Sequence, residues 1–157
     1  MFNVLYELFS SSALDQLNVF HWIAIEKDKS SELGEKVWRR LCKVIRVTPR
    51  PCIHSLRIPN SKIGDKGCKK LVKLCFNSKF QEIDDLDLSG NHIGNSGFCD
   101  LIRTLQIVDI ASKIRYLDIS RNRISAQGIK DAYSHLKLCY FQNLEVLRLG
   151  GESALLV

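Results

Sequence analysis

A short alternation of apolar and polar residues recurs along the chain. Each copy has apolar residues at its first, fourth and sixth positions, and the copies span Ile53–Ile58, Ile83–Leu88, Ile114–Ile119 and Leu144–Leu149. They begin 30, 31 and 30 residues apart. Because successive side chains of an extended strand point to opposite faces, a period of two gathers the apolar residues on one face. Each copy therefore predicts a short strand.

A glycine and an apolar stripe follow each of the first three predicted strands. After the second strand, Gly97 precedes Leu101, Ile102 and Leu105. Apolar residues three to four positions apart line one side of a helix, and a glycine punctuates the turn into it. The chain thus alternates between strands and helices.

A polar residue marks the point where each predicted strand ends. Asn91 and Asn122 take this position in the two most regular repeats. Their amides can satisfy backbone groups that no strand pairs with. Ser61 stands in their place one repeat earlier, directly after Asn60. We expect this turn to be looser, or to be rescued by Asn60.

A less regular repeat precedes these copies. Phe20, Ile23 and Ile25 follow the same offsets as the first copy, residues 31–47 carry a helical stripe, and residues 3–17 predict an earlier helix. We expect a single domain over residues 1–157. Its parts are an incomplete repeat at 1–18, a degenerate repeat at 20–52, clear repeats at 53–82, 83–113 and 114–143, and a truncated repeat at 144–157.

The segments Leu86–Ile93 and Leu117–Ile124 have the sequences LDLSGNHI and LDISRNRI. Together with their spacing, they resemble the leucine-rich repeat family in its long, ribonuclease-inhibitor-like subtype. The resemblance covers about residues 53–152. It implies an α/β fold, an open right-handed solenoid with a parallel inner β-sheet and outer α-helices. It also implies a protein–protein interaction module that binds a partner on its concave strand face.

The resemblance leaves two other functions open. Similar repeats occur in Ran GTPase-activating proteins, so a GTPase-activating protein of the Ran type is the first alternative. Arg121 and Arg123, in the turn beside Asn122, are the arginines to test for that role. Measuring GTP hydrolysis by small GTPases with and without the chain separates the two functions. The second alternative is a fragment of a larger leucine-rich-repeat protein without independent activity.

The composition changes this picture little. The chain is 45% hydrophobic and 25% charged, with a formal net charge of +6. No dense run of Lys and Arg and no aromatic RNA-binding motif occurs, so nucleic acid is not an expected partner. No apolar run approaches the ~18 residues of a membrane span. Basic residues gather on the predicted helix at 31–47, where an ordinary exposed face is favoured over a membrane-surface or nucleic-acid role.

The six cysteines predict free thiols rather than disulfides. Cys42 and Cys75 take the repeat position at which Leu105 and Leu136 stand, which indicates that they act as small hydrophobic residues. The apolar start of the chain lacks a basic leading region and is interrupted by Glu7, unlike a signal peptide. We therefore expect a cytoplasmic protein.

No group of residues predicts an enzyme, a cofactor or a metal site. Cys68 and Cys75 lie two helical turns apart, whereas zinc sites use closer cysteines and further ligands. His21 and His54 fall at the same strand position of neighbouring repeats in the predicted register. An exposed histidine ladder explains them better than a metal or catalytic pair.

The residues between the core positions of each strand face the concave side, and they are the strongest functional lead. The predicted partner-binding residues are Trp22, His54, Arg57, Asp84, Asp85, Asp87, Arg115, Tyr116, Asp118 and Arg148. Aromatic and arginine side chains are frequent energetic anchors, and clustered carboxylates steer a partner with a basic patch. Under this hypothesis the aspartates serve binding and not folding. The alternative is a solvated face whose aspartates the arginines neutralise.

The end of the chain predicts an uncapped last strand. No helical segment follows Leu149 to cover it, so its edge would be open to pairing with another chain. We therefore expect self-association through this end, unless residues 150–157 fold back as a cap.

Overall fold

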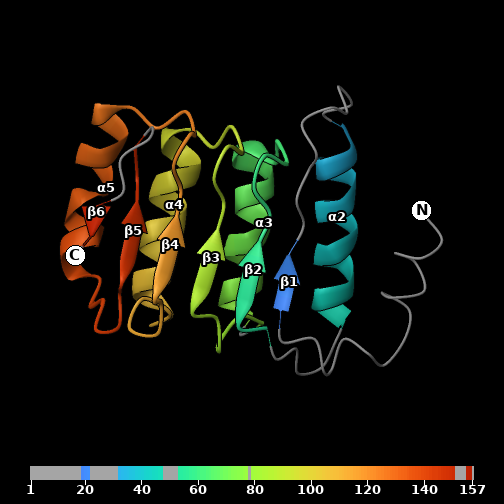
Figure 1. Cartoon of the computed structure of the whole chain (residues 1–157), viewed down its shortest axis with the longest axis horizontal. Helices are drawn as coiled ribbons and strands as arrows, with labels where there is room; N and C mark the ends of the chain where they lie inside the picture. The colour runs from blue at the N-terminus through green and yellow to red at the C-terminus, as the bar shows by residue number, and fades with distance from the viewer. Residues whose placement is uncertain (1–18, 22–31, 48–52, 78, 151–154, 157) are drawn as a thin grey trace.

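The computed structural model describes residues 19–21, 32–47, 53–77, 79–150 and 155–156 (Figure 1). Strands and helices alternate through most of this part of the chain. The strands are β1 (Val19–His21), β2 (Ser55–Arg57), β3 (Asp85–Asp87), β4 (Tyr116–Asp118), β5 (Val146–Arg148) and β6 (Leu155–Leu156). The helices are α2 (Glu32–Val47), α3 (Gly64–Phe76), α4 (Asn95–Ile107) and α5 (Ala126–Leu138).

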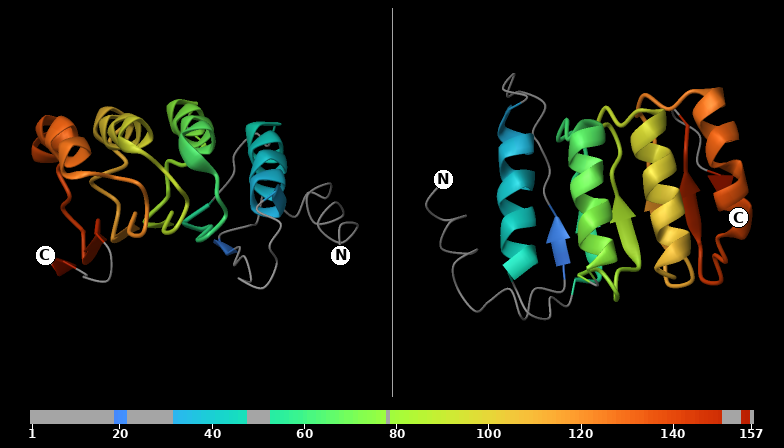
Figure 2. Two further views of the ribbon diagram at one scale, coloured as in Figure 1. Left: turned by 90° about the horizontal axis from the view of Figure 1, so that it is seen from above. Right: turned by 180° about the vertical axis from the view of Figure 1, so that it is seen from behind.

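Strands β1 to β5 form one parallel sheet in chain order. Strands β2 to β5 begin at residues 55, 85, 116 and 146, the same 30- and 31-residue spacing that the sequence shows. Figure 2 shows the helices as one layer on one face of this sheet. The chain is therefore the open α/β solenoid that the sequence predicts.

The hydrophobic core lies between the sheet and the helices. Leu56, Leu86 and Leu117 are the middle residues of their strands, lie level with one another in the sheet, and are at most 1% exposed. Leu101 and Leu105 of α4 belong to the same core. Burying one such side chain contributes about 2 kcal/mol. Because a slip of one residue would turn this row to solvent, the core fixes the register of the sheet.

Two asparagine side chains, the buried Asn91 and the partly buried Asn122, join the turns that follow the strands. Asn91 accepts the backbone N–H of Ser61 at 2.9 Å through Oδ1 and donates through Nδ2 to the carbonyl of Ile58 at 2.8 Å. Asn122 repeats the arrangement one turn later, accepting the backbone N–H groups of Asn91 and Ile93, both at 2.9 Å. Each asparagine thus supplies the partners that the preceding turn lacks.

The turn that contains Ser61 is held by the repeat that follows it. Ser61 is buried, and Asn91 accepts its backbone N–H. Asn60 contributes through its backbone, whose N–H donates to the carbonyl of Ser89 at 2.8 Å. Its φ of 53° lies in the left-handed region that asparagine tolerates. The Ser61 turn therefore receives from Asn91 the same kind of bond that the Asn91 turn receives from Asn122, although it lacks an asparagine of its own at that position.

The register of the first strand differs from the prediction. Phe20 lies level with Leu56, whereas the alternation placed Ile23 at that level. Strand β1 consequently precedes β2 by 36 residues, as Val19 pairs with Ser55. The same apolar spacing fitted a register shifted by three residues, and nothing in the local pattern distinguished the two.

The predicted ladder of His21 and His54 is wrong for the same reason, because His21 lies level with Arg57. Helix α2 agrees with the predicted helix at 31–47 to within one residue. Ile23, Ile25 and the helix predicted at 3–17 lie outside the described residues.

The far edge of the parallel sheet is occupied at two positions. Strand β6 runs antiparallel to β5 and pairs Leu156 with Val146 and Leu155 with Leu147. The prediction of an open strand edge is therefore wrong at these residues, because the chain folds back onto it. None of the described helices is both long and apolar enough to cross a membrane.

The cysteines belong largely to the core. The five that the structure describes are free, and of these Cys99 alone is partly exposed. Burial raises the pKa of the Cys42, Cys68 and Cys75 thiols to about 12. Because the thiolate is the reactive form, these groups are unreactive near neutral pH while the protein is folded.

We expect Asn91→Ala to destabilise the fold by about 3 kcal/mol, because it leaves buried backbone groups of the preceding turn without partners. Asn143→Ala is the matched control, since its amide bonds the Ser112 carbonyl at an exposed position and should cost less than about 1 kcal/mol. Urea unfolding of both variants measures the difference. Equal losses would show that Asn91 is not the partner on which the turn depends.

We expect all six thiols to react in the denatured protein and few to react in the native one. Cys99 should react first in the native protein because it is the most exposed of the described cysteines. Titration with a chromogenic thiol reagent, with and without denaturant, measures both numbers. The Cys99→Ser variant should lose the fastest native phase. Native disulfides, found after purification without oxidant, would contradict the expectation.

Candidate functional site

The candidate site is the face of the sheet turned away from the helices, which we call the strand face. In a three-residue strand the middle side chain enters the core, and the first and third side chains point the other way. The parallel register therefore builds two rows on this face. The first row is Ser55, Asp85, Tyr116 and Val146, and the second row is Arg57, Asp87, Asp118 and Arg148.

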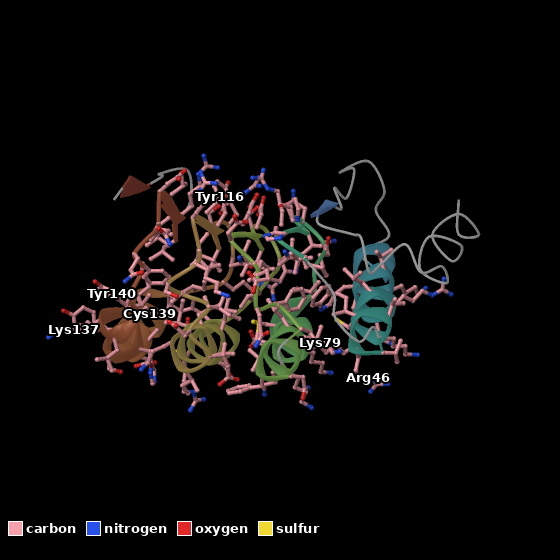
Figure 3. All side chains as sticks on the ribbon, turned by 90° about the horizontal axis from the view of Figure 1, so that it is seen from below. Arg46, Lys79, Tyr116, Lys137, Cys139 and Tyr140 are labelled. Carbon is pink, nitrogen blue, oxygen red and sulfur yellow. The ribbon has the colours of Figure 1, made fainter. Side chains whose placement is uncertain are left out.

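Tyr116 of β4 is flanked by two arginines. The guanidinium carbon of Arg57 lies 4.9 Å from the centre of the Tyr116 ring, and that of Arg148 lies 5.6 Å from it. Arg57 reaches the ring across β3, while Arg148 approaches from the neighbouring strand β5. Both distances fall within cation–π range. Figure 3 shows Tyr116 on the side of the sheet away from the helices.

A bidentate ion pair holds Arg57 in this position. Its Nε lies 3.1 Å from Oδ1 of Asp85, and its Nη2 lies 2.6 Å from Oδ2 of the same carboxylate. Ser55 donates its hydroxyl to that carboxylate at 3.0 Å. The hydrogen bond to Asp85 is the main cause that raises the pKa of the Arg57 guanidinium above its usual value. The pair fixes a long side chain that would otherwise be mobile.

Asp118 is the buried carboxylate of the strand face. Its Oδ1 accepts the hydroxyl of Ser120 at 2.6 Å and the backbone N–H of the same residue at 2.9 Å. Its Oδ2 accepts the Tyr116 hydroxyl at 3.2 Å and lies 3.4 Å from Arg148. Burial, followed by the charge of Asp118, raises the pKa of the Tyr116 hydroxyl. The phenol therefore stays protonated and donates to Asp118.

The remaining charged residues lie around this cluster. Arg115 forms an exposed ion pair with Glu145 at 2.7 Å. Asp87 accepts the backbone N–H of Ser89 at 2.9 Å. Within the described part of the chain, the carboxylates of Asp84 and Asp87 have no ion pair with a basic side chain. These two carboxylates are partly exposed.

The structure joins five of the predicted binding residues into one network, namely Arg57, Asp85, Tyr116, Asp118 and Arg148. Arg115 and the two remaining aspartates lie beside it. His54 is partly buried immediately before β2, and Trp22 lies outside the described residues. Each of the two hypotheses left open by the sequence therefore fits two of the aspartates. Arginines pair with Asp85 and Asp118, whereas Asp84 and Asp87 have no ion pair among the described residues.

Ser55 and Ser120 are not among the residues predicted from the sequence, yet they complete the hydrogen bonds of Asp85 and Asp118. Their offsets carried a signal. Ser120 lies two residues after Asp118, as Ser89 does after Asp87, and both aspartates accept the backbone N–H of that serine. An Asp-x-Ser sequence at the end of a strand is therefore the pattern to look for.

The arginines of the alternative function lie at the end of β4. Arg121 and Arg123 are exposed, and Arg121 has a φ of 54° in the left-handed region. The backbone N–H of Arg123 bonds the carbonyl of Ile93 at 2.8 Å. Among the residues that the structure describes, no group of three or more His, Cys, Asp or Glu side chains could hold a metal ion.

A solenoid of strand–helix repeats with a polar strand face defines a repeat protein of the α/β class. A family model described as Leucine Rich repeat matches residues 84–97 and 111–131. The matches include β3, β4 and the turns of Asn91 and Asn122, and they support the leucine-rich repeat family for this chain. A search of curated proteins found no match.

We expect the two aspartates that lie level in β3 and β4 to differ in their effect on stability. Asp118→Ala should destabilise the fold by about 2 kcal/mol, because a buried hydroxyl, a backbone N–H and a guanidinium lose their acceptor. Asp87→Ala is the matched variant and should cost less than about 1 kcal/mol, since its side chain is more exposed. Urea unfolding measures both. Equal effects would mean that the aspartates share one role.

Proposed function

We propose that this protein binds a partner protein through its strand face, which corresponds to the concave face of a ribonuclease-inhibitor-like solenoid. The leucine-rich repeat matches support the general class, because these domains generally mediate protein–protein interaction. The repeat length of 30 to 31 residues supports the ribonuclease-inhibitor-like subtype.

The observation that carries the proposal is the position of Tyr116 between Arg57 and Arg148. Binding costs free energy when loose side chains become ordered. The ring and both arginines already have fixed partners, so that cost is small here. Tyrosine and arginine are also the residue types that dominate binding energy at protein interfaces. The cluster is therefore a preformed anchor.

The charges beside this anchor favour a basic partner. Asp85 and Asp118 are engaged by arginines, but Asp84 and Asp87 remain without an ion pair among the described residues. Basic side chains of the partner would gain these acceptors without breaking an existing ion pair among the described residues. Such carboxylates act mainly on the rate of association and on the choice of partner.

We place this interaction in the cytoplasm. The proposal rests on the free cysteines, which suit a reducing compartment. Burial also raises the pKa of several of these thiols, so that they function as packing residues rather than as reactive groups.

The test is affinity capture from an extract of the source cells, followed by binding kinetics with the captured protein. Tyr116→Ala should raise the dissociation constant about 30-fold, the usual effect of removing a central anchor. Asp84→Asn with Asp87→Asn should slow association about tenfold at low salt and flatten its salt dependence.

The matched control is Asp109→Asn with Asp131→Asn, which removes the same charge from exposed positions outside the strand face. It should leave both the dissociation constant and the association rate unchanged. A partner that binds the Tyr116 variant as well as it binds the original chain would place the interface elsewhere. Urea unfolding of each variant separates a loss of binding from a loss of fold.

A further inference from the structure

Each of the four described helices ends at a large apolar residue that is more than half exposed. The exposed fractions are 73% for Val47 of α2, 52% for Phe76 of α3, 58% for Ile107 of α4 and 64% for Leu138 of α5. Tyr140, two residues beyond α5, is 71% exposed. Large apolar side chains are ordinarily buried in a globular protein. An exposed one at the end of each described helix therefore indicates a function for these positions.

The pattern belongs to one edge of the solenoid. The helices run parallel to one another, so their last residues lie along the same edge (Figure 1). Five of the seven large hydrophobic residues that are exposed in the described part of the chain lie there, and the other two, Ile129 and Tyr133, lie on α5. At their other ends α3, α4 and α5 begin with Gly64, Asn95 and Ala126, which are small or polar.

Basic residues lie between these apolar side chains. Arg46, Lys73 and Lys137 occupy the last turns of α2, α3 and α5. Figure 3 views the molecule from this edge and shows Arg46, Lys79, Lys137 and Tyr140 along it. Cations stabilise the carboxyl end of a helix by its dipole, which accounts for the charges. It does not account for the apolar residues beside them.

We propose that this edge docks on the surface of an anionic phospholipid bilayer. We call it the helix-end edge, and its residues are Arg46, Val47, Lys73, Phe76, Ile107, Lys137, Leu138 and Tyr140. The apolar side chains enter the interfacial layer of the bilayer, and the lysines and the arginine meet the lipid headgroups. The proposal is independent of the strand face, which lies on the other side of the sheet from the helices.

The distribution of residues favours a lipid surface over a protein partner. The core of a protein interface is a continuous apolar patch from which charges are depleted. Here single apolar side chains alternate with cations over a row of four helices, spaced roughly 10 Å apart. A fluid bilayer accepts such a separated row. Tyr140 is typical of the membrane–water boundary, because its ring is apolar and its hydroxyl is polar.

Four acidic residues lie in the described loops that lead from these helices to the next strands, and they oppose the attraction: Glu82, Asp84, Asp109 and Glu145. Two of them are paired, Glu82 with Lys113 at 3.2 Å and Glu145 with Arg115 at 2.7 Å. Against the four stand three basic residues of the same loops, the three cations in the last turns of the helices and the formal net charge of +6 for the whole chain. The electrostatic balance at the edge is therefore positive.

The experiment is co-sedimentation of the full chain with vesicles of phosphatidylcholine alone and of phosphatidylcholine with 30% phosphatidylserine. The protein should bind the anionic vesicles and dissociate as added salt screens the charges. Lys73→Gln with Lys137→Gln should weaken partitioning roughly 30-fold. Ile107→Ser with Leu138→Ser should weaken it about tenfold or more, through the loss of apolar contact.

The matched control is Lys66→Gln with Lys130→Gln, which removes the same charge from the first halves of the same two helices, α3 and α5. It should retain most of the binding, because these lysines lie toward the opposite edge. Circular dichroism of each variant verifies the fold.

Three results would overturn the proposal. The first is no binding to anionic vesicles at low salt. The second is an equal loss in both lysine pairs, which would indicate attraction by net charge alone. The third is that the Ile107→Ser and Leu138→Ser substitutions abolish self-association and have no other effect, as measured by sedimentation across a concentration series. The edge would then be a contact between copies of this chain.

Discussion

Backbone groups beyond the ends of a parallel sheet need hydrogen-bond partners, and in this protein asparagine side chains supply them. The strands are three residues long, so the sheet alone joins neighbouring repeats over a short distance. Asn91 and Asn122 extend this connection into the turns, where the chain changes direction toward its helix. Each turn therefore depends on the next repeat along the chain. The stability of one repeat cannot be separated from that of its neighbour.

The short strands also determine what the strand face can present. Each strand contributes two outward side chains, and a broad site must be assembled from several repeats. Arginine side chains are long enough to do this, as Arg57 shows by reaching from β2 to the Tyr116 ring on β4. Asp85, on the strand between them, holds the guanidinium in place. The network thus ties together strands that share no backbone hydrogen bonds.

Much of the fold could be predicted from the sequence because the same spacing of apolar residues recurs in several repeats, so that many residues support each predicted element. The strands β2 to β5 and the helices that follow β2 to β4 all lie within the predicted segments. The register of β1 could not be predicted, since its alternating apolar residues fit two positions three residues apart. The two residues of β6 are too few to carry a periodic pattern.

The candidate site was predictable in its residues but not in its pairing. The sequence places Arg57, Asp85 and Tyr116 on one face, yet the rotamers of a long side chain decide which neighbour it meets. Burial then separates residues that the pattern treats alike. Asp87 and Asp118 take the same strand position, but Asp118 is 4% exposed and interacts with four groups. Among the described residues Asp87 accepts a single backbone N–H, that of Ser89.

The repeat also determines how new surfaces arise on this protein. Residues near 30 positions apart become neighbours, so one apolar residue per repeat is enough to build a row. The last residues of the helices, at 47, 76, 107 and 138, form such a row although they are distant in sequence. The cations beside them serve the helix dipole whatever the edge contacts. At this edge the same basic side chains can therefore contribute both to stability and to docking. On the strand face the two roles fall to different residues, since Asp118 serves stability and Asp87 serves binding.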